Sequence, residues 1–197
     1  MTAVLQLRDV HRRYGSGASE ASALRGVDLS VETGELVAVM GPSASGKSTL
    51  LNLAGGLDRP TSGRVLVNGY DITVMDAAAI ATLRRKEIGI VFQELNLLPT
   101  LSAVENVMLP LELDGVGRRR AREMASEALS RVRLTGDIER FPDDLSGGEE
   151  QRVAIARAIA GQRSLLLADE PTGALDTMAG DQIADTQLRP DDRWVRR

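Results

Sequence analysis

The stretch Gly41-Pro-Ser-Ala-Ser-Gly46-Lys47-Ser48 decides the fold, because it matches the P-loop pattern G-x-x-x-x-G-K-[ST] in full. The apolar run at residues 35–40 predicts a strand buried on both faces before the loop, and residues 47–54 predict a helix after it. In such a strand–loop–helix unit, backbone N–H groups and the positive end of the helix dipole bind phosphate oxygens. The sequence therefore predicts an α/β fold with a site for nucleotide phosphates.

The side chains of this loop suit ATP bound together with Mg²⁺. Lys47 is predicted to bind the β- and γ-phosphates, and the Ser48 hydroxyl to ligate Mg²⁺. The alternative is an ordinary glycine-rich turn, but a chance match in a chain of this length is on the order of 1%. The predicted ATP contacts are Gly41, Pro42, Ser43, Ala44, Ser45, Gly46, Lys47, Ser48 and Thr49.

A second acidic motif follows the apolar run at residues 164–168, which predicts a buried strand. Asp169 and Glu170 stand where this strand ends, at the edge of a sheet where nucleotides bind. Asp169 is predicted to hold Mg²⁺, and Glu170 to polarise the attacking water as general base. Many buried strands end in acidic turn residues, so the motif gains its meaning from the P-loop that accompanies it.

A third motif is Leu145-Ser146-Gly147-Gly148-Glu149. Its spacing predicts a capping box, with Ser146 as the N-cap of a helix over residues 147–160 and Glu149 three positions later. Two glycines in a first helical turn are costly, so they indicate a backbone that a ligand approaches closely. An open helix N-terminus with bare N–H groups is also suited to bind an anion.

Composition restricts the remaining possibilities. The chain has 197 residues, a net charge of -4 and no cysteine, so disulfides and thiolate metal sites are excluded and no nucleic-acid partner is indicated. No signal peptide is expected, and no apolar run reaches the roughly 20 residues of a transmembrane helix. Any role at a membrane is therefore expected to depend on a partner.

The rest of the pattern predicts a layered domain. Residues 4–10, 27–31 and 64–67 alternate apolar and polar residues, as in a small antiparallel sheet near the N-terminus. Residues 88–92 predict another buried strand, and residues 95–145 a helical insert. One helical face in this insert is predicted to carry Ala121, Met124, Ala125, Ala128, Leu129 and Val132.

The third motif, continued by Gln151-Arg152-Val-Ala-Ile-Ala-Arg157-Ala, resembles the signature of the ABC transporter ATPases. The resemblance implies an ABC-type P-loop NTPase domain over residues 1–176. It also implies a homodimer in which Ser146, Gly147, Gly148 and Glu149 of one copy contact the ATP bound to the other.

Further roles follow from the same resemblance. Tyr14 matches the aromatic residue that stacks on adenine, with an exposed strand residue as the alternative. Gln93 matches the glutamine that reaches Mg²⁺ and the attacking water, with a plain strand-end polar residue as the alternative. Gly173-Ala-Leu-Asp176 matches the loop that communicates across the dimer, with a solvated loop capped by Asp176 as the alternative.

Two longer stretches suggest a subfamily. Asn96-Leu-Leu-Pro-Thr-Leu-Ser-Ala-Val-Glu-Asn106-Val and Asp169-Glu-Pro-Thr-Gly-Ala-Leu-Asp176 are similar to the lipoprotein-releasing and macrolide-export type. This similarity implies an integral-membrane permease as partner, bound through residues 93–106, from Gln93 to Asn106. The subunit is then expected at the cytoplasmic face of the plasma membrane.

The end of the chain departs from the family pattern. The family carries a switch histidine after a strand that follows Asp176, whereas the single histidine here is His11. Residues 177–197 have no strand-length apolar run, so we expect a truncated domain that lacks its C-terminal strands, folds marginally and hydrolyses ATP poorly. A nucleotide-binding remnant without hydrolysis and a soluble ABC ATPase outside transport are the alternatives.

Overall fold

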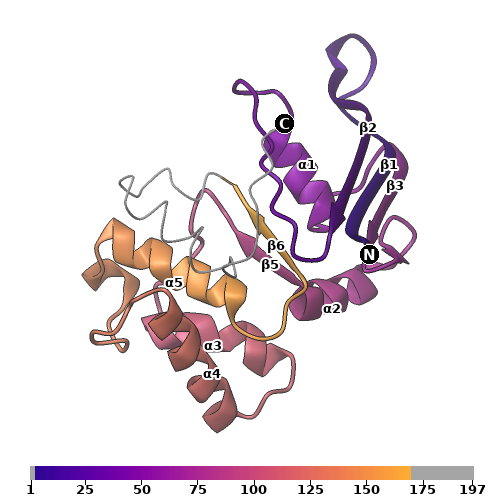
Figure 1. The fold of residues 1–197 in the computed structure, drawn as a ribbon. Helices are drawn as coiled ribbons and strands as arrows, with labels where there is room; N and C mark the ends of the chain where they lie inside the picture. Colours follow the sequence, from indigo (N-terminus) through magenta and orange to yellow (C-terminus); the bar gives the residue numbers. More distant parts are fainter. Residues whose placement is uncertain (1–2, 170–197) are drawn as a thin grey trace. The chain divides into compact units, whose positions relative to one another are not determined.

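The computed structural model describes residues 3–169 (Figure 1). This part of the chain divides into two compact units, with the boundary between Arg84 and Arg85. Three of the predicted features lie outside the described residues: Glu170, the segment from Gly173 to Asp176, and residues 177–197.

The first unit is built on an antiparallel sheet with the strand order β2-β1-β3-β4. It consists of β1 (Ala3–Tyr14), β2 (Ala21–Glu32), β3 (Ser62–Val67) and the short β4 (Tyr70–Asp71), with a 3-10 turn at Gly17–Ser19 between β1 and β2. All three strands predicted near the N-terminus are therefore confirmed. Asn68 and Gly69, both at positive φ (49° and 81°), form the turn from β3 to β4.

Two helices complete this unit. The helix α1 (Lys47–Ala54) has the predicted bounds and turns Leu50, Leu53 and Ala54 into the core. The second helix, α2 (Ala77–Glu87), buries Ile80, and its last three residues belong to the second unit. Buried residues on the sheet include Leu7, Val10, Val65 and Val67, which form the other side of this core.

The predicted buried strand at residues 35–40 is wrong. This segment has no regular secondary structure, and its apolar side chains are exposed, with Leu36 at 55% and Met40 at 85%. A strand of a parallel sheet needs hydrogen-bonding neighbours on its edges and cover on its faces. Within residues 3–169, no strand pairs with residues 35–40, so the apolar run finds no place in a sheet.

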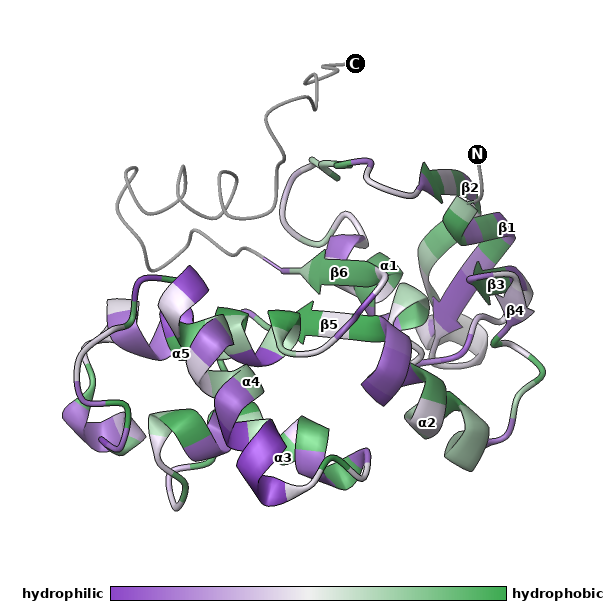
Figure 2. Ribbon diagram, turned by 60° about the horizontal axis from the view of Figure 1, so that its bottom comes forward, coloured by the Kyte–Doolittle hydropathy of each residue, from purple (hydrophilic) through white to green (hydrophobic). Residues whose placement is uncertain are grey.

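Over its described residues, 85–169, the second unit contains two parallel strands and the helices α3, α4 and α5 (Figure 1). Strand β5 (Ile88–Val91) pairs with β6 (Leu165–Ala168) from Ile88 opposite Leu165 to Val91 opposite Ala168, which confirms both predicted strands. Both strands are hydrophobic along most of their length (Figure 2). A Cβ added at Gly89 would lie 2.1 Å from the Ala158 carbonyl oxygen, so only glycine allows β5 to approach the neighbouring helix this closely.

The helices of this unit are α3 (Ala103–Leu113), α4 (Arg118–Arg131) and α5 (Gly147–Ile159), with a 3-10 turn at Pro142–Asp144 before α5. Their shared core includes Val104, Val107, Met108, Leu129 and Val153. The predicted apolar face of α4 is confirmed: Ala121, Ala125, Ala128, Leu129 and Val132 are buried, and Met124 packs against them. Among the described helices, none is both long and apolar enough to cross a membrane.

Candidate nucleotide-binding site

The P-loop turns into α1 through backbone conformations that few residues adopt. Gly46 has φ 94°, and a Cβ there would lie 2.5 Å from the Ala23 carbonyl oxygen of β2. Ala44 also has a positive φ, 62°, within an exposed loop at residues 41–45. Glycine at position 46 is therefore required both by its backbone conformation and by the close approach of β2.

The N-terminus of α1 has no side-chain cap, unlike those of α3 and α5. The first amides of a helix have no partner within the helix, so at α1 they remain available to an anion. Lys47 lies over the same loop, where its Nζ donates to the carbonyl oxygens of Gly41 (2.8 Å) and Pro42 (2.9 Å). Ser48 and Thr49 stand in the first turn of the helix. This set of donors fits a phosphate group.

Tyr14 is the last residue of β1 and is 40% exposed. Its hydroxyl donates to Asp58 (2.9 Å), and the Arg12 guanidinium lies 4.3 Å from the centre of its ring. Arg12 also donates twice to Asp58, through Nε and Nη2, both at 2.8 Å. Partial burial by itself would raise the pKa of Asp58, but hydrogen bonds from Tyr14, the Arg59 amide and Arg12 lower it.

The predicted capping box at the start of α5 is confirmed. Ser146 Oγ accepts from the Glu149 amide (3.4 Å), while the Glu149 carboxylate accepts from the amide (2.9 Å) and hydroxyl (2.8 Å) of Ser146. Arg140 donates to the same carboxylate and to the carbonyl oxygen of Asp144 (3.3 Å). The Arg140 hydrogen bond, followed by those from Ser146, lowers the pKa of Glu149 to about 2.

The space beside the signature glycines is consistent with a close approach by a ligand. A Cβ added at Gly147 would meet no atom of the described chain within 4 Å, so packing within the subunit does not require glycine there. Glycine in a first turn costs helix stability, and packing within the described chain does not compensate for that cost at Gly147.

Gln93 and Asp169 stand beyond the carboxyl ends of neighbouring parallel strands. Asp169 directly follows β6 and donates its amide to the Val91 carbonyl oxygen (3.0 Å), while the exposed Gln93 follows β5 by two residues. The structure thus brings these two predicted Mg²⁺ ligands to one edge of the β5–β6 pair, which is the edge at which α/β folds bind ligands.

The segment after Gln93 is anchored from beneath by two side chains. The buried Asn106 of α3 donates to the carbonyl oxygens of Leu98 (3.1 Å) and Leu101 (3.0 Å), and it accepts from the Leu98 amide (2.8 Å). Arg157 of α5 donates to the carbonyl oxygens of Leu95 and Asn96, both at 2.6 Å. The signature helix and this segment are therefore directly hydrogen-bonded.

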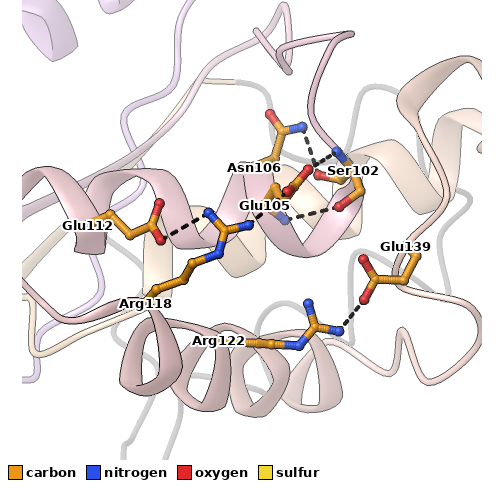
Figure 3. A network of polar contacts seen from close by, with 7 residues as sticks. All are labelled: Ser102, Glu105, Asn106, Glu112, Arg118, Arg122 and Glu139. Carbon is orange, nitrogen blue, oxygen red and sulfur yellow. Dashed lines mark hydrogen bonds and ion pairs between the residues drawn. The ribbon is translucent and has the colours of Figure 1, made fainter.

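Ion pairs join α3 to its neighbours around Asn106 (Figure 3). Ser102 and Glu105 form a second capping box at the start of α3, and Arg118 of α4 lies between Glu105 (3.3 Å) and Glu112 (3.8 Å). Backbone hydrogen bonds from Ala103 to Arg140 and from Val104 to Ile138, both 2.9 Å, then continue to the loop before the signature.

Sequence reasoning missed Asp58, Arg140 and Arg157 as parts of these sites. Arg157 stands within the signature stretch, so its position could have been noted, but its acceptors lie about 60 residues earlier in the chain. Arg12 and Asp58 are 46 residues apart and belong to no motif. Only the fold brings these residues together.

A P-loop at the start of α1 and an acidic residue, Asp169, directly after β6 in an α/β fold define a nucleotide-binding domain of the P-loop NTPase class. The family model for the ABC transporter matches residues 24–173. The chain is 47% identical over 189 residues to the lipoprotein-releasing system ATP-binding protein LolD of Geobacter metallireducens, covering 96% of this chain and 84% of LolD. It is 46% identical over 182 residues to the ABC transporter ATP-binding protein YknY of Bacillus subtilis, covering 92% and 79%.

Two further similarities are informative. The macrolide export ATP-binding/permease protein MacB of Hyphomonas neptunium is 47% identical over 180 residues, which are 91% of this chain but 28% of MacB. The dimeric structure of MJ0796, a bacterial ABC transporter cassette, superposes with a TM-score of 0.87 at 42% identity, covering 92% of this chain and 80% of MJ0796. The chain therefore belongs to the ABC transporter family, as an ATP-binding subunit that powers a membrane transporter.

Proposed function

We propose that this subunit hydrolyses Mg-ATP in sites shared between two copies of itself and drives an exporter or a lipoprotein-release system. The proposal rests mainly on the N-terminus of α1. There the first amides have no side-chain cap, and Lys47 donates to the exposed loop that precedes the helix. The relatives named for lipoprotein release and macrolide export support the type of transporter.

The residues of the site take distinct roles in this proposal. Lys47 and the P-loop amides hold the phosphates, and the Tyr14 ring stacks on the adenine. Ser48 of the P-loop, and Asp169 and Gln93 beyond the ends of β6 and β5, would each be a ligand for Mg²⁺, which would supply charge neutralisation at the phosphates. Glu170, which lies outside the described residues, takes the proton of the attacking water.

The signature residues complete the site of the partner copy. Ser146 to Glu149 begin α5 with its positive dipole end, and the open space at Gly147 admits a phosphate held by another subunit. The dimeric MJ0796 cassette, which has also been solved after hydrolysis with ADP and Pi, supports this arrangement. The capping box keeps the turn formed before a ligand arrives.

The test is ATP-dependent dimerisation measured by size exclusion with light scattering. Glu170→Gln keeps the size of the side chain but removes the base, so this variant is expected to form a persistent dimer with Mg-ATP. Adding Ser146→Arg is expected to abolish that dimer, whereas Ser130→Arg, at an exposed position of α4, is expected to leave it intact. A folded Glu170→Gln variant that stays monomeric in saturating Mg-ATP contradicts the shared site.

The permease is proposed to bind residues 93–106 from the cytoplasmic side of the plasma membrane. The anchors Asn106 and Arg157 hold this segment in shape while leaving Leu98 and Asn96 at the surface. Crosslinks from a co-expressed permease are expected to concentrate on this segment. Crosslinks confined to residues 4–31 would contradict the assignment.

A further inference from the structure

The end of β1 lies beside the P-loop in the first unit. Arg12 pairs with Leu24, and Tyr14 with Ala21, across the β1–β2 ladder. The same stretch of β2 meets the P-loop, since Gly46 packs against the carbonyl oxygen of Ala23. Tyr14 and the P-loop therefore both lie next to the same stretch of β2.

Asp58 connects this ring to the far end of the P-loop helix. It follows α1, and its amide donates to the Asn52 carbonyl oxygen (3.3 Å) while its carboxylate receives Arg12, Tyr14 and the amide of Arg59. The Arg12 and Asp58 side chains are only 23% and 25% exposed. The pair is thus partly shielded from water and held by both β1 and the end of α1.

The contacts restrict how Tyr14 can turn. The hydroxyl donates to Asp58, and the Arg12 guanidinium lies over one face of the ring, so a base that stacks on Tyr14 would have to use the opposite face. A ring fixed in this way loses little freedom when a base stacks on it. The cation behind the ring also withdraws electron density from the open face, which favours contact with an electron-rich purine.

We propose that Arg12 and Asp58 are positioning residues of the adenine subsite, holding Tyr14 with one face open for the base. The inference rests on the proposed binding of ATP, and it predicts an effect on base recognition that is separate from phosphate binding. Substitutions of Arg12 or Asp58 are expected to weaken the binding of nucleotides that carry a base, while the P-loop still binds phosphates.

The experiment compares Mg-ATP with Mg-tripolyphosphate, which has the phosphates but no base, by calorimetric titration. Tyr14→Ala is expected to lower the affinity for Mg-ATP by about 5- to 100-fold and to leave the affinity for Mg-tripolyphosphate unchanged. Arg12→Gln is expected to lower the affinity for Mg-ATP by about three- to tenfold, again without an effect on the affinity for Mg-tripolyphosphate. Asp58→Asn, which breaks the charged pair, is expected to act like Arg12→Gln.

The matched control is Arg13→Gln, which removes the same charge from the neighbouring residue of β1. Arg13 pairs with the exposed Glu20 instead of Asp58, so ATP affinity should not change. The inference would be overturned if Arg12→Gln and Arg13→Gln lowered the affinity for ATP equally. It would also be overturned if Arg12→Gln lowered the affinities for ATP and tripolyphosphate equally. A wild-type chain that binds tripolyphosphate as tightly as ATP also overturns it while the P-loop assignment stands, whereas binding of neither ligand refutes the proposed function itself.

Discussion

The P-loop (residues 41–48) and the signature motif (residues 145–149) both place glycines at the N-terminus of a helix, yet different contacts stabilise the two helix N-termini. At α5, Ser146 and Glu149 satisfy the first turn from within, and Arg140 fixes the carboxylate. At α1, no side chain caps the helix, and the segment that leads into it is exposed and irregular. Side chains of the same subunit thus hold the turn at residues 146–149, while the first amides of α1 have no side-chain cap and would be available to a ligand.

The largest expected difference between the two regions is in hydrogen exchange. Amides at residues 36–40 have no strand partner within the described chain, whereas Val153, Ala154 and Ala156 lie in the buried face of α5. We expect exchange in the first segment to be faster by on the order of 1,000-fold or more, measured by mass spectrometry. Similar protection in both segments would show that residues 36–40 are paired in solution.

Elements that depend on local sequence patterns could be predicted from the sequence, whereas elements that depend on distant partners could not. The helix α1, the capping box at Ser146 and the strands β5 and β6 follow from local patterns, and all were predicted correctly. The apolar run at 35–40 has an equally clear pattern, but a buried strand depends on neighbours that its own residues do not supply. The site anchors Asp58, Arg140 and Arg157 also depend on partners from other segments, so no local pattern reveals them.

A pair of leucine truncations measures the same contrast as stability. Leu129 is fully buried between α4 and its neighbours, whereas Leu36 is exposed. Leu129→Ala is expected to lower the free energy of unfolding by about 2–5 kcal/mol, and Leu36→Ala by less than about 0.5 kcal/mol. Urea denaturation of both variants gives the comparison, and a large loss from Leu36→Ala would mean that residue 36 is packed.

A smaller effect concerns the charge at the signature turn. The lowered pKa of Glu149 means that its contribution to stability is present above its ordinary value of 4.5 and is lost as the pH falls toward about 2. Arg140→Gln removes the largest cause of the shift, so the pKa of Glu149 should rise. The measurement is an NMR titration of the Glu149 carboxyl carbon.

Arg131→Gln is the control for this titration, because it removes the same charge at an exposed position at the end of α4. The pKa of Glu149 should be the same in this control as in the wild type. If Arg140→Gln leaves the midpoint of Glu149 where it was, Arg140 does not hold the signature turn.

The central claim is that the open N-terminus of α1 binds the phosphates of ATP through Lys47. Calorimetric titration with Mg-ATP tests it directly, with Lys86→Ala as the matched control because Lys86 is the only other lysine and is exposed on α2. Lys47→Ala is expected to weaken binding by on the order of 100-fold or more, since it removes a charged donor to the phosphates, while Lys86→Ala binds like the wild type. Unchanged affinity in a folded Lys47→Ala variant would contradict the claim.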